Sequence, residues 1–456
     1  MDRKTIENLR HWHKQSDRKP LIIRGARQVG KTWLVRYFAK QLNLTLLELN
    51  FEREQKLREL FIDNDPVKIL KKLSVFFGKD IDLKQSLLFL DEIQAAPELL
   101  GKLRWFAEEM PELPCIATGS LLDFILDEHV VSMPVGRVQY LHLEPMSFEE
   151  FLLAIEQSKL CEYLANYALT DKLPQILHDK LWEYFREYVF IGGLPAAVSN
   201  WRQNHSFLAV NEIHQNLLAT YRDDFAKYAK RIPHERLEEV FKAIPASLGQ
   251  KFKYSSVNKD VRSELIKNAL NLLCKAKVCH KIYVCSGSGI PLESSIKESI
   301  FKVFFLDVGL VSAACRLTLS SKMKFDELHL LNEGGIAEQV AGQLLRTTFP
   351  YFIEPKLYYW MSEKSGSEAE IDYLIQDNMQ IIPVEVKSGS TGTLRSLHTF
   401  MQLRNLNSAV RINADYPSVT TVNIKNHAGV TINYQLLSIP LYLTEQIHRL
   451  IDLLPI

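Results

Sequence analysis

The sequence has few cysteines, almost no net charge and no long apolar run, and each absence excludes a class of protein. Six scattered cysteines among 456 residues are too few for a disulfide framework, so we expect reduced thiols. A formal net charge of +1 excludes a polycation, so any nucleic-acid-binding surface must be local. No eighteen-residue apolar run and no secretory signal are visible, and we therefore expect a cytoplasmic protein without a membrane partner.

The most informative motif that is present is Gly-Ala-Arg-Gln-Val-Gly-Lys-Thr, which matches the P-loop pattern G-x-x-x-x-G-K-[ST]. It lies between an apolar run at 21–23 and a helical run at 33–42, the strand–loop–helix context that the motif requires. Lys31 is expected to reach the β- and γ-phosphates of ATP, and Thr32 to bind Mg²⁺. The predicted nucleotide-binding residues are Gly25, Ala26, Arg27, Gln28, Val29, Gly30, Lys31 and Thr32.

Two carboxylates, Asp91 and Glu92, follow a continuous apolar run at 86–90. Such a run is typical of a buried parallel strand, which delivers the acids to the sheet edge where α/β proteins bind ligands. Asp91 is then predicted to bind Mg²⁺, and Glu92 to orient or polarise the attacking water. The alternative is an N-cap for a helix that starts near Pro97, which the P-loop makes the weaker interpretation.

Strand and helix patterns alternate between residues 20 and 145, as in a parallel α/β nucleotide-binding domain. Further strands are predicted at 44–49, 87–90, 115–118 and 139–143, and helices at 67–77 and 97–110. The strand at 115–118 leads to Ser120, whose hydroxyl either faces the γ-phosphate or caps a helix at 121–126. This part of the chain therefore predicts an α/β fold.

The middle of the chain is first helical and then mixed. Residues 147–232 open with a serine cap and contain a helix stop at 192–195, which is either a lid over the nucleotide or a plain interhelical turn. Residues 233–325 have the order of a winged helix, with helices at 236–248 and 263–276 followed by strands at 278–284 and 303–306. Bases outnumber acids ten to four between 251 and 302, which indicates either contacts with duplex DNA or solvated helix faces.

The C-terminal part, 326–456, combines a helix at 337–346 with strands at 372–375 and 381–387. Alternation along the second strand places Glu385 and Lys387 on one face, and the spacing from Asp372 suits a hairpin. With Glu338 on the helix, these residues are a candidate second site for a divalent metal, in which Lys387 would hold or activate a water. The alternative is a set of solvated charges on a half-exposed sheet.

In these motifs the chain resembles the bacterial and archaeal AAA+ ATPases that carry an AAA_14-type core and a DUF4143 C-terminal region. The resemblance rests on residues 19–32, 90–94, 118–120, 136–137, 143–151, 192–195, 371–372 and 385–389. It implies a P-loop AAA+ ATPase core at 1–146, a helical lid at 147–232, a winged-helix domain at 233–325 and a PD-(D/E)XK nuclease-like DUF4143 domain at 326–456. It also implies Ser120 as a sensor, Pro195 packed near the adenine, and Arg137 as a γ-phosphate sensor acting in cis or from a neighbouring subunit.

Three functions remain open at this level. The first is an ATP-driven switch or motor that acts on duplex DNA through the winged helix and C-terminal domain. The second is a STAND-like signalling ATPase that controls a protein partner or its own self-association, without DNA. The third is an ATP-regulated, metal-dependent nuclease. Because the PD-(D/E)XK fold is often reused for binding alone, we favour a structural or DNA-binding role for the C-terminal domain over catalysis.

Overall fold

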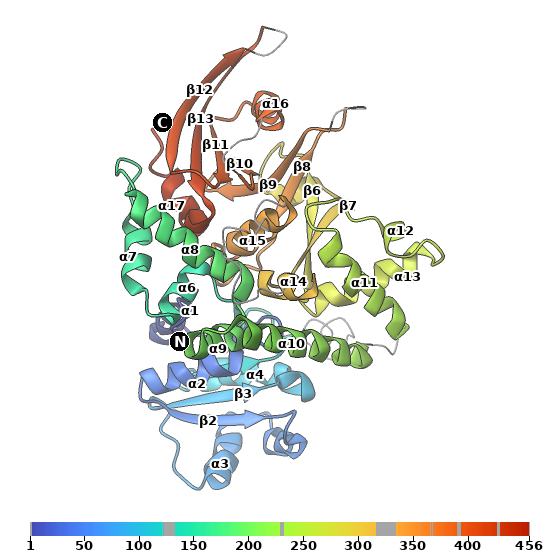
Figure 1. Cartoon of the computed structure of the whole chain (residues 1–456). Helices are drawn as coiled ribbons and strands as arrows, with labels where there is room; N and C mark the ends of the chain where they lie inside the picture. The colour runs from blue at the N-terminus through green and yellow to red at the C-terminus, as the bar shows by residue number, and fades with distance from the viewer. Residues whose placement is uncertain are drawn as a thin grey trace. The chain divides into compact units, whose positions relative to one another are not determined.

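The computed structural model describes residues 2–120, 122, 133–228, 232–315, 334–364, 366, 368–389, 394–425 and 429–455, without the side chains of 226–228. The chain forms two compact units (Figure 1). The first comprises Met1–Pro145 with the short segments Lys275–Lys277 and Phe349–Glu354, and the second comprises Met146–Cys274, Val278–Thr348 and Pro355–Ile456. In the described ranges, no helix is both long and apolar enough to cross a membrane.

The first unit is built on an all-parallel, five-stranded sheet with the order β2-β3-β4-β1-β5. Its strands are β1 (Leu21–Arg24), β2 (Thr45–Asn50), β3 (Ser86–Asp91), β4 (Cys115–Thr118) and β5 (Gln139–His142). Its helices are α1 (Thr5–Lys14), α2 (Lys31–Gln41), α3 (Pro66–Phe77) and α4 (Glu98–Glu109), with the 3₁₀ segments η1 (Gln55–Phe61) and η2 (Ile93–Ala95). This is the predicted α/β P-loop fold, and all four further strands are confirmed to within two residues.

Local sequence signals set several of these boundaries. The side chain of Asp65 accepts hydrogen bonds from the N–H groups of Val67 and Lys68, and Pro66 occupies the first turn of α3. Gly78, with φ 65°, ends the same helix in the left-handed conformation that glycine adopts without strain. The central strands β3 and β4 are buried along their whole length, so their apolar runs form the middle of the core.

The second unit begins with a bundle of helices: α6 (Phe148–Ala154), α7 (Ser158–Asn166), α8 (Gln175–Ile191), α9 (Pro195–Asn204) and α10 (Phe207–Tyr228). Ser147 and Glu150 form a reciprocal capping box at the start of α6, which confirms the predicted serine cap. The helix stop is also confirmed, because α8 ends at Gly192, with φ 70°, and Pro195 begins α9. The predicted helix at 121–126 lies outside the described residues, except for residue 122.

The helices α11 (His234–Ala246), α12 (Tyr254–Val257) and α13 (Ser263–Lys275) follow, and then the hairpin of β6 (Cys279–Cys285) and β7 (Ile296–Phe305), with η3 (Leu292–Ser295) between its strands. Later helices are α14 (Val308–Ala314), α15 (Gly334–Thr347), α16 (Arg395–Arg404) and α17 (Ile447–Ile451), with η6 (Leu441–Gln446) before α17. The helix–helix–hairpin order of the predicted winged helix is thus present.

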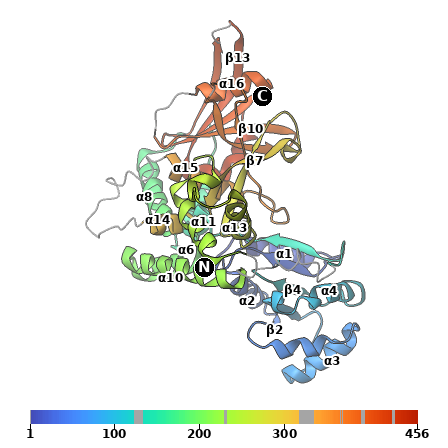
Figure 2. The ribbon, with the colours of Figure 1, turned by 90° about the vertical axis from the view of Figure 1, so that its right-hand side faces the viewer.

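The hairpin does not stand alone, because it belongs to a mixed eight-stranded sheet with the order β12-β13-β11-β10-β9-β8-β6-β7 (Figure 2). The remaining strands are β8 (Tyr358–Met361), β9 (Glu370–Asp377), β10 (Gln380–Val386), β11 (Ser408–Asn413), β12 (Ser418–Lys425) and β13 (Thr431–Pro440). β6 pairs in parallel with β8, with Tyr283 opposite Tyr358. The predicted hairpin of β9 and β10 is confirmed by their antiparallel register.

Candidate functional site

The P-loop of the first unit connects β1 to α2 and depends on two glycines. Gly30 precedes α2 with φ 96°, a left-handed conformation that favours glycine. At Gly25 a side chain would not fit, because a Cβ atom would lie 2.4 Å from the carbonyl oxygen of Leu143. The loop is therefore fixed both by its backbone conformation and by close packing, and it leads directly into the N-terminus of α2.

Lys31 lies inside this loop and is buried, with 7% of its surface exposed. Its Nζ donates hydrogen bonds to the carbonyl oxygens of Gly25 at 3.0 Å and Ala26 at 2.7 Å. Burial lowers the pKa of Lys31 to about 8, and the charges of Glu92 and Asp91 offset part of that effect. The ammonium group is thus held in the loop and is easier to deprotonate than an exposed lysine.

Asp91, at the end of β3, is the centre of a polar network. The hydroxyl of Thr32 donates to its carboxylate, with Oγ1 at 3.2 and 3.1 Å from the two oxygens. Asn50 at the end of β2 donates to Oδ2 at 3.0 Å, and Thr118 at the end of β4 donates to Oδ1. The structure therefore brings the predicted pair Thr32 and Asp91 together, and it adds Asn50 and Thr118, which the sequence analysis did not include.

The residues next to Asp91 carry polar atoms without partners. Glu92 has a left-handed backbone with φ 51°, and its Oε2 accepts a hydrogen bond from Nε2 of Gln94 at 2.5 Å. Within the described part of the chain, Gln94 Oε1 and Ser120 Oγ are buried and have no hydrogen-bond partner. Buried polar atoms in proteins nearly always have partners. Such atoms beside the P-loop acids fit a site that receives a polar ligand.

Arg137 and Pro195, two other predicted site residues, are not among the described residues that donate hydrogen bonds to Asp91. The side chain of Arg137, which precedes β5, is 47% exposed. Its Nε lies 2.6 Å from a carboxylate oxygen of Glu108 on α4. Pro195 lies in the second unit, at the first position of α9. Their roles at the γ-phosphate and at the adenine remain predictions.

In the second unit, Asp307 joins the turn between α8 and α9 to α15. Its Oδ2 accepts hydrogen bonds from Gly193 N at 2.6 Å and Gln343 Nε2 at 3.0 Å, and its Oδ1 caps α14 through Gly309 N at 3.0 Å. Burial raises the pKa of Asp307 to about 6 despite these hydrogen bonds. We name Asp307 with its partners Gly193 and Gln343 the Asp307 hub.

Gly193 of the Asp307 hub also contacts Met146, the first residue of the second unit. Met146 N donates to Gly193 O at 2.7 Å, and a Cβ atom at Gly193 would lie 2.0 Å from Met146 O. Only glycine therefore fits at residue 193. Met146 follows the first unit directly in the sequence, so the chain continues from the ATPase sheet into this hub.

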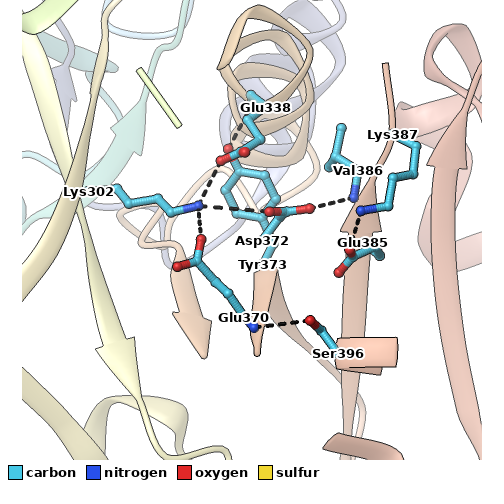
Figure 3. A network of polar contacts seen from close by, with 9 residues as sticks. All are labelled: Lys302, Glu338, Glu370, Asp372, Tyr373, Glu385, Val386, Lys387 and Ser396. Carbon is cyan, nitrogen blue, oxygen red and sulfur yellow. Dashed lines mark hydrogen bonds and ion pairs between the residues drawn. The ribbon is translucent and has the colours of Figure 1, made fainter. Parts of the chain in front are cut away.

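The four residues of the predicted second metal site come together in the C-terminal part of the second unit (Figure 3). Glu338 lies on α15, Asp372 on β9, and Glu385 at the end of β10, where Lys387 Nζ donates to its Oε1 at 2.5 Å. The alternative of solvated charges is wrong for these acids, since the side chains of Glu338 and Asp372 are 17% and 12% exposed and Glu385 is 4% exposed.

Lys302 lies among these acids, although the sequence analysis counted it with the bases of a possible DNA-binding surface and did not assign it to this cluster. Its Nζ is 2.8 Å from Glu338 Oε2 and 3.8 Å from Asp372 Oδ1, and it also pairs with Glu370. The three carboxylates outweigh burial and raise the pKa of Lys302 well above its ordinary value. Among the described residues, no group of three or more histidines, cysteines or acids is arranged to hold a metal ion.

The bases between 251 and 302 divide into two groups. Lys302 is buried, and Lys281 and Lys297 donate to Asn271 at 2.6 Å and Glu363 at 2.7 Å. Lys277 belongs to the first unit, where its Nζ lies 2.7 Å from a carboxylate oxygen of Glu354. We name the exposed bases between residues 251 and 267 of the second unit the α13 basic patch: Lys251, Lys253, Lys259, Arg262 and Lys267.

Comparisons with known proteins assign three segments of the chain. A family model described as an AAA domain, AAA_14, matches residues 17–152. The domains of unknown function DUF8612 and DUF4143 match residues 182–321 and 333–440. The DUF8612 match runs from the predicted lid through most of the predicted winged helix. No curated protein matches the chain.

Similar solved structures share 13–15% identity with the chain. The Walker-type ATPase PABY2304 of Pyrococcus abyssi, at 15% identity, covers 69% of this chain and 95% of its own length with a TM-score of 0.43. The Aeropyrum pernix ORC2 protein in ADPNP–ADP complexes, at 14%, covers 69% and 93% with a TM-score of 0.33. The Thermotoga maritima RuvB Holliday junction branch migration motor, at 13%, covers 62% and 90% with a TM-score of 0.29. From its parallel sheet, P-loop and family matches, the chain contains an AAA_14 domain with the P-loop fold and a C-terminal DUF4143 domain.

Proposed function

We propose that this protein is an ATP-hydrolysing switch that acts on duplex DNA. The hydrolytic part rests on the contact between Thr32 and Asp91 beside Lys31, because a hydroxyl and a carboxylate at this position suit the oxygen coordination of Mg²⁺. When bound there with ATP, Mg²⁺ would neutralise charge on the phosphates. Lys31 would hold the phosphates, and Asn50 and Thr118 would keep the Asp91 carboxylate oriented.

Glu92 is proposed to orient the attacking water. The amide of Gln94 donates to Glu92 Oε2, which leaves Glu92 Oε1 as an acceptor for the attacking water. Ser120 Oγ, which is buried and has no partner among the described residues, would contact the terminal phosphate. These residues position and stabilise charge, which is what phosphoryl transfer requires.

The switch part of the proposal rests on the Asp307 hub. Met146, the lid glycine Gly193, the cap of α14 and Gln343 on α15 share one buried hydrogen-bond network. A movement of the chain at Met146 would break or strain these bonds, so it would be transmitted toward α15 and the DUF4143 domain. Packed polar networks with discrete arrangements are suited to such coupling.

The single observation that carries the DNA part is the α13 basic patch. Its five bases are exposed: Lys251 and Lys253 precede α12, Lys259 and Arg262 lie between α12 and α13, and Lys267 lies on α13. A local cluster of this kind is the electrostatic footprint of phosphate binding on a chain whose net charge is only +1.

The proposal is tested by ATPase turnover of the full chain with and without duplex DNA. We expect duplex DNA to stimulate turnover several-fold, and the double variant Lys259→Glu/Lys267→Glu to lose the stimulation while keeping its basal rate. The matched control is Lys172→Glu/Lys425→Glu, which makes the same charge change at exposed positions outside the patch. Turnover that is indifferent to DNA in the unaltered protein contradicts the DNA part of the proposal.

One observation favours the signalling ATPase as a second candidate. In a free winged helix the hairpin is available to contact DNA, but here β6 is paired with β8 on its other edge. Nucleotide-dependent self-association, measured by light scattering with ATP and with ADP and without any response to DNA, would support this second function.

A further inference from the structure

Lys302 occupies an unusual position for a lysine. It lies in β7 between the buried residues Phe301 and Val303, and only 2% of its surface is exposed. Figure 3 shows its ammonium group between the carboxylates of Glu338, Glu370 and Asp372. Burial of an ammonium group is costly unless it is paired, and here the pairing comes from two other elements, α15 and β9.

Two further oxygens of the cluster have partners of their own, whereas Glu385 Oε2 is buried and has no hydrogen-bond partner among the described residues. Asp372 Oδ2 accepts the backbone N–H of Val386 at 2.7 Å, and Glu385 Oε1 accepts Lys387 Nζ. Divalent cations such as Mg²⁺ need several oxygen ligands at about 2.0–2.6 Å on all sides. The Lys302 ammonium lies between Glu338 and Asp372, with its Nζ 2.8 and 3.8 Å from their nearest carboxylate oxygens.

The surroundings also restrict the space beside the ammonium group. The ring of Tyr359 lies 5.2 Å from Lys302 Nζ, and Gly249, with φ 72°, approaches so closely that a Cβ atom there would be 3.1 Å from Glu338 Oε1. A divalent cation placed between Glu338 and Asp372 would compete with the Lys302 ammonium for the same carboxylates.

We infer that Lys302 is the resident cation of the DUF4143 acid cluster, in the place that a divalent metal would take, so that the domain acts without a bound metal. This goes beyond the proposed function, which does not depend on the C-terminal site. In this inference Lys302 neutralises the charges of Glu338 and Asp372. It also links β7 to α15 and β9 through ion pairs. The acids of the cluster should therefore bind a metal ion once the ammonium group of Lys302 is removed.

The test is a Mn²⁺ titration of the nucleotide-free full chain, with free Mn²⁺ measured by electron paramagnetic resonance. We expect the unaltered protein and Asp372→Asn to bind the same number of ions. Lys302→Met should bind one additional Mn²⁺ per chain, and the double variant Lys302→Met/Asp372→Asn should lose it. Lys297→Met, which removes an exposed lysine from the same strand, is the matched control and should bind as the unaltered protein does.

Two outcomes would overturn the inference. The first is a Mn²⁺ ion bound by the unaltered protein and lost in Asp372→Asn, which would mean that the cluster holds a metal beside Lys302. The second is a folded Lys302→Met, checked by circular dichroism, that gains no ion. Because the first comparison needs no Lys302 variant, it decides the main claim even if Lys302→Met does not fold.

Discussion

At the scale of single residues, the nucleotide site depends on a buried cation. Lys31 donates to two loop carbonyls, and the nearby acids only partly offset the effect of burial on its pKa. ATP phosphates would replace those weak neutral acceptors with charged ones, and charge-assisted hydrogen bonds are roughly twice as strong. The lysine is therefore held ready for phosphate.

We predict that Lys31→Ala removes MgATP binding, whereas Glu92→Gln keeps binding and loses turnover. The first change deletes the cation of the phosphate loop, and the second changes only the group proposed to orient water. Isotherms with a fluorescent ATP analogue and phosphate release measure the two effects. An unchanged affinity in Lys31→Ala would show that the site is assigned wrongly.

The lowered pKa of Lys31 predicts how ATP binding depends on pH. Its ammonium form, which binds phosphate, is fully present below about pH 8 and is lost above it. Linkage then weakens affinity by about tenfold per pH unit above that value, until the pKa of the bound state is reached. Dissociation constants between pH 6.5 and 9.5 measure this. Lys31→Arg, which stays protonated, is the control and should show no such inflection.

The sequence predicted site residues best where a short motif assigns a defined role to each residue. Lys31, Thr32 and Asp91 were all found from the P-loop and the apolar strand, and the structure brings them together. Lys302 was not assigned to the acid cluster because its partners lie 36 and more positions away in the chain. The one signal it leaves is a lone lysine inside the apolar stretch of β7, a position where lysine is rare without a partner.

At the scale of elements, the Asp307 hub fixes the turn between α8 and α9 against the cap of α14. Its carboxylate accepts four hydrogen bonds, from Gly193, Gln343, Gly309 and Leu310. In a fully buried place the ionised carboxylate lacks the hydration it would have in water, which raises its pKa.

This raised pKa predicts a pH effect on stability. The folded pKa of about 6 lies above the ordinary 3.8, so the contribution of this group is present below 3.8 and is lost as the pH rises through 6. A shift of this size corresponds to about 3 kcal/mol in the free energy of unfolding. The difference in that energy between Asp307→Asn and the unaltered protein should change by most of this amount, about 2 kcal/mol, between pH 4 and 6.5 in urea unfolding. The exposed Asp260→Asn is the control, and a constant difference for Asp307→Asn would contradict the prediction.

The α13 basic patch makes a separate prediction about DNA affinity. Lys259→Glu/Lys267→Glu should weaken duplex binding and flatten its salt dependence, by about one unit of slope for each lost phosphate contact. Fluorescence anisotropy across a salt series measures the slope, with Lys172→Glu/Lys425→Glu as the control. If the slope of the salt dependence does not change in the patch variant, the signalling-ATPase hypothesis is favoured over DNA binding.

Most elements were predictable because hydrophobic periodicity and caps are local signals. β4 was predicted at its observed bounds, and α3 and α13 to within one residue. The pairing of β6 with β8 was not predicted, because a parallel pair between distant segments has no turn sequence to reveal it. The winged-helix interpretation therefore found the right elements and did not foresee that its hairpin joins the C-terminal sheet.

At the scale of the whole molecule, the second unit contains one sheet that runs from the predicted wing to the last strands. Gln339 on α15 strengthens this connection, since its side chain bonds both the N–H and the carbonyl of Phe305 at 2.8 and 2.9 Å. Lys302 adds an ionic tie at the same junction. We therefore expect the segment 233–315 and the DUF4143 domain to unfold together rather than as separate domains.

The same junction decides what the DUF4143 domain does to DNA. If the Lys302 ammonium holds the place between Glu338 and Asp372, no metal ion is bound there to activate a water molecule. We therefore predict that the protein does not cleave linear, circular or single-stranded DNA with Mg²⁺ or Mn²⁺. Gel analysis of the purified full chain measures this, with and without ATP. Trace nuclease contamination is distinguished by Asp372→Ala, purified in parallel, because only cleavage by this site disappears in that variant. Cleavage that is lost in Asp372→Ala would make the protein an ATP-regulated nuclease, and Lys302 would then have to leave the cluster during the reaction.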